Sequence, residues 1–214
     1  MKMKKIDPMQ EQLRLQEMYQ YEKEAKAQGY SLIGGVDEAG RGPFVGPVCA
    51  ACVILKEDFY IPGLNDSKKI KEADRERMYD QVLEQAVACG VAMVDNEVID
   101  EINILNATKE AVYQAMSQMQ VQPDYLLTDY LKLEKCPLPQ LPLAKGDSKS
   151  ASIAAASIVA KVTRDRYMRQ VAEQYPQYNF LKNKGYGTKE HITALQTYGP
   201  CPLHRKTFIK KYLP

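Results

Sequence analysis

Two apolar runs joined by a glycine- and proline-rich stretch constrain this chain more than any other feature. Residues 31–36 and 47–55 are rich in Val and Ile and predict two core strands. The first strand is expected to stop at two adjacent carboxylates, Asp37 and Glu38. Because neighbouring strand residues face opposite ways, one of the two should point into the core. Burying a carboxylate without a partner costs several kcal/mol, a penalty that a bound divalent cation would remove.

The remaining patterns alternate between helix and strand. Helices are expected over residues 9–28, from a polar loop after residue 64 to near residue 90, over 96–119 as one or two helices, over 145–175 as the longest helix, and within 185–199. Further strands are expected at 90–95 and at 123–129. This order predicts an α/β domain with a mixed central sheet flanked by helices.

The composition is that of a soluble globular protein of about one domain, with 214 residues, 45% hydrophobic and 26% charged. Cys49 and Cys52 have CxxC spacing, but they lie in an apolar run with no second pair, which favours buried thiols in a reducing compartment over a zinc site. Neither a secretory signal nor an apolar stretch of membrane length is recognisable. We therefore expect a cytoplasmic protein that makes no membrane contact.

Charge is distributed unevenly along the chain. The formal net charge is +2, yet residues 181–214 carry seven Lys or Arg against one acid, Glu190. A basic tail on an otherwise acidic chain suits a polyanionic partner. A solvated charged end is an equally good interpretation of this feature alone.

Two more carboxylates occupy positions like that of the first pair. Asp129 is expected to end a strand, and Asp147 to precede the longest helix. The ends of neighbouring strands converge in space, so these groups can meet although they are distant in sequence. Each also has a structural alternative: Asp129 as a turn residue, and Asp147 as a helix N-cap in competition with Ser148 and Ser150.

Four carboxylates without His or Cys partners make an oxygen-only site, which selects Mg²⁺ or Mn²⁺ over zinc. Two such ions roughly 3.5–4 Å apart would clamp the attacking and leaving oxygens of a phosphodiester. In a continuous helix, Asp165 would lie about 27 Å from Asp147 at about 1.5 Å per residue. Asp165 is therefore expected to be structural, as an ion-pair partner of Arg164, Arg166 or a neighbouring segment.

Six motifs in succession resemble those of ribonuclease HII, the type 2 ribonuclease H. They are "GVDEAGRGPFVGPV", "LNDSKKI", "INILNAT", "KGDSKSASIAAASIVAKVTRDR", "GYGTKEH" and "GPCPLHRKTF", and the resemblance runs from about residue 32 to residue 208. It implies a ribonuclease H-like fold. Its parts would be an N-terminal helical segment at 1–30, a catalytic domain at 31–180, and a basic C-terminal helical extension at 181–214 that completes the substrate site.

The resemblance also implies an activity. The enzyme would cleave the RNA strand of RNA/DNA hybrids, and would cut 5′ of single ribonucleotides in duplex DNA, leaving 5′-phosphate and 3′-hydroxyl ends. It would act as a monomer with Mn²⁺ or Mg²⁺, in DNA replication and ribonucleotide excision repair. The family's catalytic, metal-binding quartet falls on Asp37, Glu38, Asp129 and Asp147, with Asp37 the best candidate to bridge two ions.

Recognition of the ribose is expected from two other motifs. By resemblance, Gly40, Arg41 and Gly42 grip the backbone at the ribonucleotide, and Tyr186 of "GYGT" stacks at the sugar and senses the 2′-hydroxyl. The two histidines, His191 and His204, are expected to be structural or to lie near phosphate. Further side chains with the chemistry of phosphate contacts are Lys68, Lys69, Ser148 and Ser150.

One departure and two alternatives accompany this interpretation. Many relatives have glycine where this chain has Tyr130, which puts the shape of that loop in question. Arg41 between glycines favours type HII over the sister type HIII. A non-catalytic nucleic-acid-binding domain on the same fold is disfavoured by the intact quartet. A resolvase- or integrase-type nuclease shares such carboxylates, but does not share the "GRG" and "GYGT" motifs.

Overall fold

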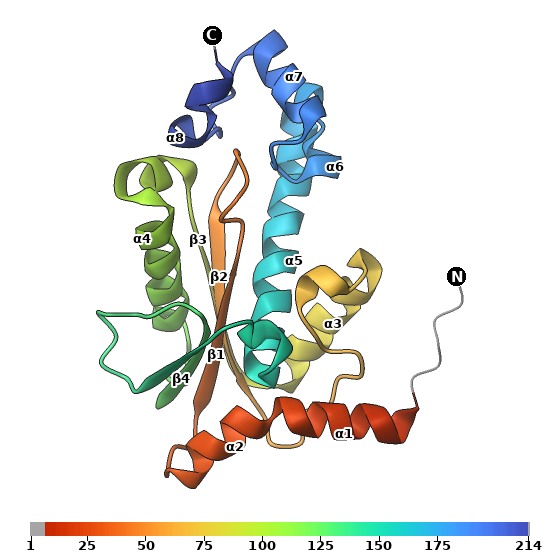
Figure 1. The fold of residues 1–214 in the computed structure, drawn as a ribbon, viewed down its shortest axis with the longest axis vertical. Helices are drawn as coiled ribbons and strands as arrows, with labels where there is room; N and C mark the ends of the chain where they lie inside the picture. The colour runs from red at the N-terminus through yellow and green to blue at the C-terminus, as the bar shows by residue number, and fades with distance from the viewer. Residues whose placement is uncertain (1–6, 214) are drawn as a thin grey trace.

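The computed structural model describes residues 7–213, which form a five-stranded mixed sheet. The strands lie in the order β3 (Ala86–Val94), β2 (Val48–Leu55), β1 (Ile33–Ala39), β4 (Tyr125–Asp129) and β5 (Gln140–Leu143). β2 is antiparallel to both of its neighbours, whereas β1, β4 and β5 run parallel to one another. The expected α/β class on a mixed sheet is confirmed (Figure 1).

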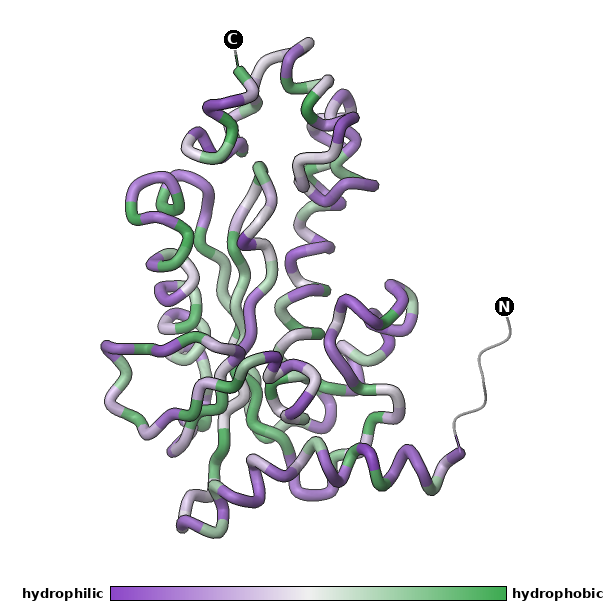
Figure 2. The backbone as a smooth tube through the Cα atoms, viewed as in Figure 1, coloured by the Kyte–Doolittle hydropathy of each residue, from purple (hydrophilic) through white to green (hydrophobic). Residues whose placement is uncertain are grey.

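Helices cover both faces of the sheet. α5 (Ala151–Gln174) and α3 (Glu72–Gln85) lie on one face, and α4 (Asn96–Ser117) lies on the other (Figure 1). Side chains of β2 alternate between the two cores, so that Cys49 packs toward α5 and Cys52 toward α4. The two thiols therefore cannot share a metal ion. Figure 2 shows hydrophobic residues along the central strands and hydrophilic residues over much of the outer helices.

The longest helix lies directly on the backbone of β1. A Cβ atom on Gly35 would come within 2.1 Å of the Ser152 carbonyl carbon, so only glycine allows this approach. Gly35 faces α5, and its neighbours two residues away along the strand face the same way. The α5 side of β1 therefore continues from Gly35 to Asp37.

Element boundaries differ from expectation in three places. α3 ends at Gln85, not near residue 90, because residues 86–90 pair with β2 and extend β3. The proline-rich loop contains β5, where Pro142 is tolerated because the strand lies at the edge of the sheet. The longest helix begins at Ala151, and Gly146–Ser148 form a separate 3-10 turn, η2.

The helical segment expected at residues 9–28 divides into α1 (Pro8–Met18) and α2 (Gln20–Ala27), which lie across the lower end of the sheet (Figure 1). Residues 1–6 of the expected N-terminal segment lie outside the described part of the chain. Glu22 of α2 is buried and accepts hydrogen bonds from the Ser150 hydroxyl (2.7 Å), the Ser152 amide (2.9 Å) and the Ser152 hydroxyl (2.6 Å). α2 thereby fixes the first turn of α5.

The C-terminal part is helical and packs against the connection between β1 and β2. It comprises η3 (Pro176–Tyr178), α6 (Phe180–Asn183), α7 (Lys189–Tyr198), α8 (Lys206–Ile209) and η4 (Lys210–Tyr212). The Phe44 amide donates to the Gly185 carbonyl (2.8 Å), and the Gly46 amide donates to that of Leu203 (2.9 Å). This layer is the upper part of Figure 1, where the β1–β2 connection reaches it.

Candidate active site

Three of the four predicted carboxylates meet at one edge of the sheet. Val36 pairs with Thr128 in the parallel β1–β4 ladder, which places Asp37 beside Asp129 on the next residue of each strand. The Gly146 amide donates to the Asp129 carboxylate (2.7 Å) and so brings η2, with Asp147, against β4. Asp37, Asp129 and Asp147 each offer an oxygen within 4.8 Å of the others. We call these three residues the acidic triad.

The acidic triad is short of positive charge. Burial raises the pKa of Asp37 well above its usual value, and the nearby charges of Glu38 and Asp129 add to this shift. The pKa of Asp147 rises to about 6, mainly through burial and then through Asp66 and Asp129. Carboxylates held this close together repel one another unless protons or cations compensate them. Three such oxygens fit a hard divalent ion such as Mg²⁺ or Mn²⁺.

Glu38, the fourth predicted carboxylate, lies beside the acidic triad but points elsewhere. As its neighbour on β1, it faces the opposite way from Asp37 and accepts a hydrogen bond from Arg41 (3.1 Å). Burial raises its pKa; Arg41 opposes this shift, and Asp129 adds to it. Glu38 thus lies within electrostatic range of Asp129, and its bond to Arg41 connects it to the predicted Gly-Arg-Gly turn.

The "LNDSKK" loop contributes one predicted residue and one that the sequence analysis missed. The Lys68 ammonium lies 3.9 Å from the Asp147 carboxylate. Partial burial lowers the pKa of Lys68, but the carboxylates around it, led by Asp66, outweigh this effect and the net shift is upward. Asp66 accepts the Lys68 amide and also raises the pKa of Asp147. The position of Asp66 two residues before Lys68 in the motif could have signalled this role.

The other three predicted phosphate contacts have surroundings of their own, although Ser148 directly follows Asp147 in η2. Lys69 and Ser148 line a separate hollow of about 390 Å³ beside α1 and α2. Ser150 is fully buried; its hydroxyl caps the Ile153 amide of α5 and donates to Glu22. A direct phosphate contact does not fit this position, because no face of the Ser150 side chain reaches solvent. Ser150 is the N-cap of α5, the role for which Asp147 was the sequence alternative.

The two predicted ribose-reading motifs are in contact. A Cβ atom on Gly42 would lie 3.5 Å from Cε1 of Tyr186, so the edge of the ring lies against this glycine. Gly40 has φ +94, and a Cβ there would come within 2.1 Å of the Arg164 guanidinium. Arg41 and Tyr186 remain partly exposed. The two segments, about 145 residues apart in sequence, thus form one surface beside Glu38.

Two buried arginines, Arg164 and Arg205, hold this surface from behind. Arg205 donates to the carbonyls of Gly40 (2.6 Å), Arg41 (2.9 Å) and Gly46 (2.9 Å). Arg164 donates to those of Val45 (3.0 Å), Pro47 (2.9 Å) and Lys184 (3.1 Å). Neither forms a salt bridge with any residue in 7–213. We call the two guanidiniums the carbonyl clamp. Arg205 was missed because arginine in a basic tail suggests an exposed side chain, and Arg164 was expected instead as an ion-pair partner of Asp165.

Comparison with known proteins decides the family. The family model described as ribonuclease HII matches residues 34–211. This chain belongs to the ribonuclease HII family. It is 56% identical over 200 residues to the ribonuclease HII of Caldanaerobacter subterraneus subsp. tengcongensis, covering 94% of this chain and 83% of that protein. It is 52% identical over 210 residues to the ribonuclease HII of Acetivibrio thermocellus, covering 98% and 82%.

Solved structures agree with this assignment. Ribonuclease H2 from Pyrococcus horikoshii matches with a TM-score of 0.71 at 25% identity, over 85% of this chain and 97% of that one. Ribonuclease HII from Archaeoglobus fulgidus, solved in complex with PCNA, shares the fold with a TM-score of 0.68 at 23% identity, over 84% and 94%. The chain is thus a ribonuclease H enzyme, a nuclease of a divalent-metal-dependent family. Within the described residues, no helix is both long and apolar enough to cross a bilayer.

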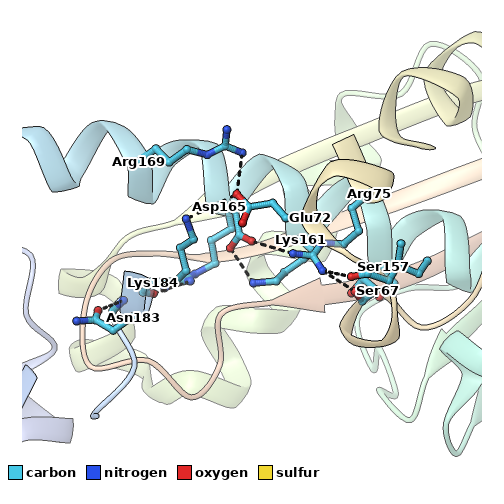
Figure 3. A network of polar contacts seen from close by, with 12 residues as sticks. Ser67, Glu72, Arg75, Ser157, Lys161, Asp165, Arg169, Asn183 and Lys184 are labelled. Atoms are coloured by element: carbon cyan, nitrogen blue, oxygen red, sulfur yellow. Dashed lines mark hydrogen bonds and ion pairs between the residues drawn. The ribbon is translucent and has the colours of Figure 1, made fainter. Parts of the chain in front are cut away.

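A polar network connects the loop at Ser67 with α3 and α5 (Figure 3). Arg75 donates to the Ser67 carbonyl (3.0 Å), and the hydroxyls of Ser67 and Ser157 lie 2.9 Å apart. Ser157 also lowers the pKa of Asp37 against the effect of burial. Arg75 also reaches Asp165 (3.7 Å). The loop carrying Lys68 is thereby fastened to the helix that covers Asp37.

Asp165 has the structural role predicted for it, but with other partners. Its carboxylate pairs with Lys161 (2.7 Å) and Arg75 (3.7 Å). The two arginines named beforehand are occupied elsewhere, since Arg164 belongs to the carbonyl clamp and Arg166 pairs with Glu76 (2.6 Å). The prediction of an ion pair is confirmed, and of its three alternatives the neighbouring segment is the right one, through Arg75 of α3, whereas Arg164 and Arg166 are not partners. Burial of Arg164 among loop carbonyls could not be read from its neighbours in sequence.

Proposed function

We propose that this enzyme cleaves the RNA strand of RNA/DNA hybrids and cuts duplex DNA on the 5′ side of single embedded ribonucleotides. The products would carry 5′-phosphate and 3′-hydroxyl ends. One observation supports this most: the acidic triad adjoins a surface on which Tyr186 lies against the Gly-Arg-Gly turn. Discrimination between RNA and DNA depends on the 2′-hydroxyl, and a turn without Cβ atoms lets the backbone approach a sugar closely.

The residues divide into two roles. Asp37, Asp129 and Asp147 would hold two divalent ions, Mg²⁺ or Mn²⁺, with Glu38 completing the set, and Asp37 is best placed to be shared. When bound, such ions supply an activated water and stabilise the leaving 3′-oxygen. No histidine serves as a base, because His191 and His204 are buried in the C-terminal extension and bond to each other.

The remaining side chains of the site would place the scissile phosphate. Arg41 is half exposed and offers a planar fork for a phosphate next to the acidic triad. Lys68 adds a cation beside Asp147. The Tyr186 ring, 44% exposed, offers a face on which the sugar at the RNA–DNA junction can pack. Phosphate contacts set the register, and the contact to the ribose decides where cleavage occurs.

The electrostatics count against a protein that only binds nucleic acid. Three mutually repelling carboxylates oppose a phosphate at the same place unless cations intervene. We further propose that the protein acts as a monomer, because the acidic triad and the ribose-reading surface both come from one chain. Roles in DNA replication and in ribonucleotide excision repair follow from the proposed substrates.

The test uses three duplexes of one sequence: all-DNA, DNA with one ribonucleotide, and an RNA/DNA hybrid. Each is incubated with enzyme in Mg²⁺, in Mn²⁺ and in EDTA, and the ends are mapped on a sequencing gel. We expect cleavage 5′ of the single ribonucleotide and within the hybrid RNA, no cleavage of the all-DNA duplex, and none in EDTA. Equal treatment of the all-DNA and ribonucleotide duplexes would refute the proposal.

A further inference from the structure

The turn that carries Tyr186 is held at its carbonyl by two donors. The Thr188 amide donates to the Tyr186 carbonyl oxygen (2.8 Å), and His191 Nδ1 lies 2.9 Å from the same oxygen. Thr188 is also the N-cap of α7, which begins at the next residue. The side chain of His191 therefore fastens the start of α7 to the turn before it.

His191 is the middle of a directed chain of hydrogen bonds. Its Nε2 lies 3.1 Å from His204 Nε2, and the Cys201 amide donates to His204 Nδ1 (2.9 Å). An amide can only donate, so His204 Nδ1 accepts and its proton resides on Nε2. His204 then donates to His191 Nε2, which leaves the His191 proton on Nδ1, facing the Tyr186 carbonyl. The longer contact from His204 Nδ1 to the Cys201 carbonyl (3.3 Å) is the weaker alternative.

The surroundings keep both rings neutral. His191 and His204 are 0% and 1% exposed, and the rings of Phe44, Tyr178 and Phe180 pack around them. Burial lowers the pKa of both imidazoles, that of His204 to about 4 with a further contribution from His191. The guanidinium of Arg205, the residue after His204, is also buried nearby. A proton on both Nε2 atoms would break the chain, and this environment opposes it.

The same turn is closely packed on its other side. A Cβ atom on Gly187 would lie 2.2 Å from the Phe44 ring, so the turn is pressed against Phe44. Phe44 is bound through its own amide to the Gly185 carbonyl and through its carbonyl to the Arg205 amide (2.7 Å). Because the edge of the Tyr186 ring lies against Gly42, a shift of the Tyr186 backbone changes the ribose-reading surface directly.

We propose that His191 and His204 are positioning residues for ribose recognition: as a neutral pair with fixed tautomers, they hold the Tyr186 carbonyl and so set the ring of Tyr186 against Gly42. The role in ribose recognition rests on the proposed function. The chain of hydrogen bonds does not depend on it. Neither histidine touches substrate or metal. The pair acts through Tyr186 alone.

The first test reads the tautomers in the wild-type protein. The chain has two histidines, so long-range ¹H–¹⁵N correlation spectra contain two imidazoles to assign. At pH 7 we expect His191 protonated on Nδ1 only and His204 on Nε2 only. His204→Gln assigns the signals and retains a donor toward His191. A cationic ring at pH 7, or His191 protonated on Nε2, would overturn the inference whatever the enzyme cleaves.

The second test is a double-mutant cycle on kcat/KM for the duplex with one ribonucleotide. His191→Leu removes the donor to the carbonyl, and we expect a loss of about tenfold, as for a lost buried hydrogen bond. His191→Asn keeps an N–H in the place of Nδ1 and should restore most of the activity. In a Tyr186→Ala background, His191→Leu should change kcat/KM by less than about twofold. Equal losses in both backgrounds would show a purely structural role and overturn the inference.

Two outcomes must be kept apart. If wild-type enzyme ignores the ribonucleotide, the proposed function fails, while the tautomers still decide whether the chain of hydrogen bonds exists. If cleavage is ribonucleotide-specific but the cycle is additive, the proposed function stands and this inference falls. Where His191→Leu does not fold, as judged by circular dichroism, His204→Leu replaces it in the same cycle.

Discussion

The acidic triad and the carbonyl clamp are both clusters of charged, largely buried side chains, yet they are compensated in opposite ways. The acidic triad joins three carboxylates, of which Asp147 has Lys68 at 3.9 Å as its cation. In the carbonyl clamp, Arg164 and Arg205 each donate three hydrogen bonds to backbone carbonyls. The first cluster would be compensated by a bound cation, whereas the second is compensated by the fold itself.

This difference separates activity from stability. Burial, and then repulsion by neighbouring carboxylates, raises the pKa of Asp37 and Asp147, so the folded protein bears a free-energy cost there when no cation is present. The carbonyl clamp stabilises the folded protein. Its guanidiniums connect the C-terminal extension to the 40–47 turn, and removing one would leave buried carbonyls without a hydrogen-bond donor. Neutralising an acid should spare the fold and abolish catalysis, whereas removing an arginine should damage the fold first.

The largest expected effect is on turnover in Asp129→Asn. We expect kcat to fall by at least about a thousandfold, because one oxygen of the divalent-ion site loses its charge. Binding of the RNA/DNA hybrid, measured by fluorescence anisotropy, should be largely intact. The denaturant concentration at the midpoint of unfolding in EDTA should be no lower than that of the wild type. Asp124→Ala is the matched control: its carboxylate accepts the Ser31 and Leu32 amides, so stability should fall and turnover should persist. Loss of binding in folded Asp129→Asn would instead make Asp129 a substrate contact.

The carbonyl clamp is tested by Arg205→Met. This variant removes three charge-assisted donors from buried carbonyls, and we expect the free energy of unfolding to fall by about 3 kcal/mol. Urea unfolding followed by circular dichroism measures the change. Lys206→Met, at the exposed neighbouring position, should change stability by less than about 0.5 kcal/mol. Equal stabilities of the two variants would remove the distinction between the clusters.

The two clusters should also respond to pH with opposite sign. The pKa of Asp147 is raised from 3.8 to about 6, so its contribution to stability is present below pH 4 and is lost as pH rises to 6. The pKa of His204, beside the clamp, is lowered from 6.5 to about 4, so its contribution is present above pH 6.5 and is lost as pH falls to 4. The melting temperature in EDTA is measured across this pH range for the wild type, for Asp147→Asn and for His204→Gln. The difference between the wild type and each variant then isolates the contribution of that residue.

Divalent ions sharpen this pH comparison. Saturating Mg²⁺ favours ionised carboxylates, so the trend assigned to Asp147 should disappear while that of His204 remains. If the stability differences for Asp147→Asn and His204→Gln changed with pH in the same direction, the separation of the two clusters would be contradicted. A pH dependence of His204→Gln that changes with Mg²⁺ would contradict it as well.

The smallest effect is expected at Tyr130, at the rim of the acidic triad. Tyr130 has φ +60 and is 79% exposed, in a backbone conformation that favours glycine. Tyr130→Gly should therefore raise the free energy of unfolding by about 0.5 kcal/mol, the relief of strain being partly offset by the entropy of the unfolded chain. Tyr130→Ala keeps the strain and serves as control. A loss of stability in Tyr130→Gly would show that the exposed ring makes contacts that outweigh the strain.

Much of the fold and part of the site could be predicted from local pattern. Apolar runs gave β1, β2 and β4, and the carboxylates at their ends converged because parallel neighbours share an edge. The start of β3 was missed because residues 86–90 are strand only through pairing with β2. Ser150 was misjudged because its partner, Glu22, lies more than 100 residues away in sequence. Arg205 was overlooked for the same reason, since the 40–46 carbonyls are equally distant. Burial of a polar side chain depends on such distant partners, and periodicity does not report them.

The contact between Glu22 and the start of α5 bears on how this enzyme can be shortened. The family match begins at Gly34, after α2 has ended, so a chain trimmed to the family boundary keeps every recognised motif. It would nevertheless lose the carboxylate that accepts three donors from the first turn of α5, four residues from Asp147. The span matched by the family model and the unit of folding are therefore not the same in this protein, and the smallest active fragment should begin before Glu22.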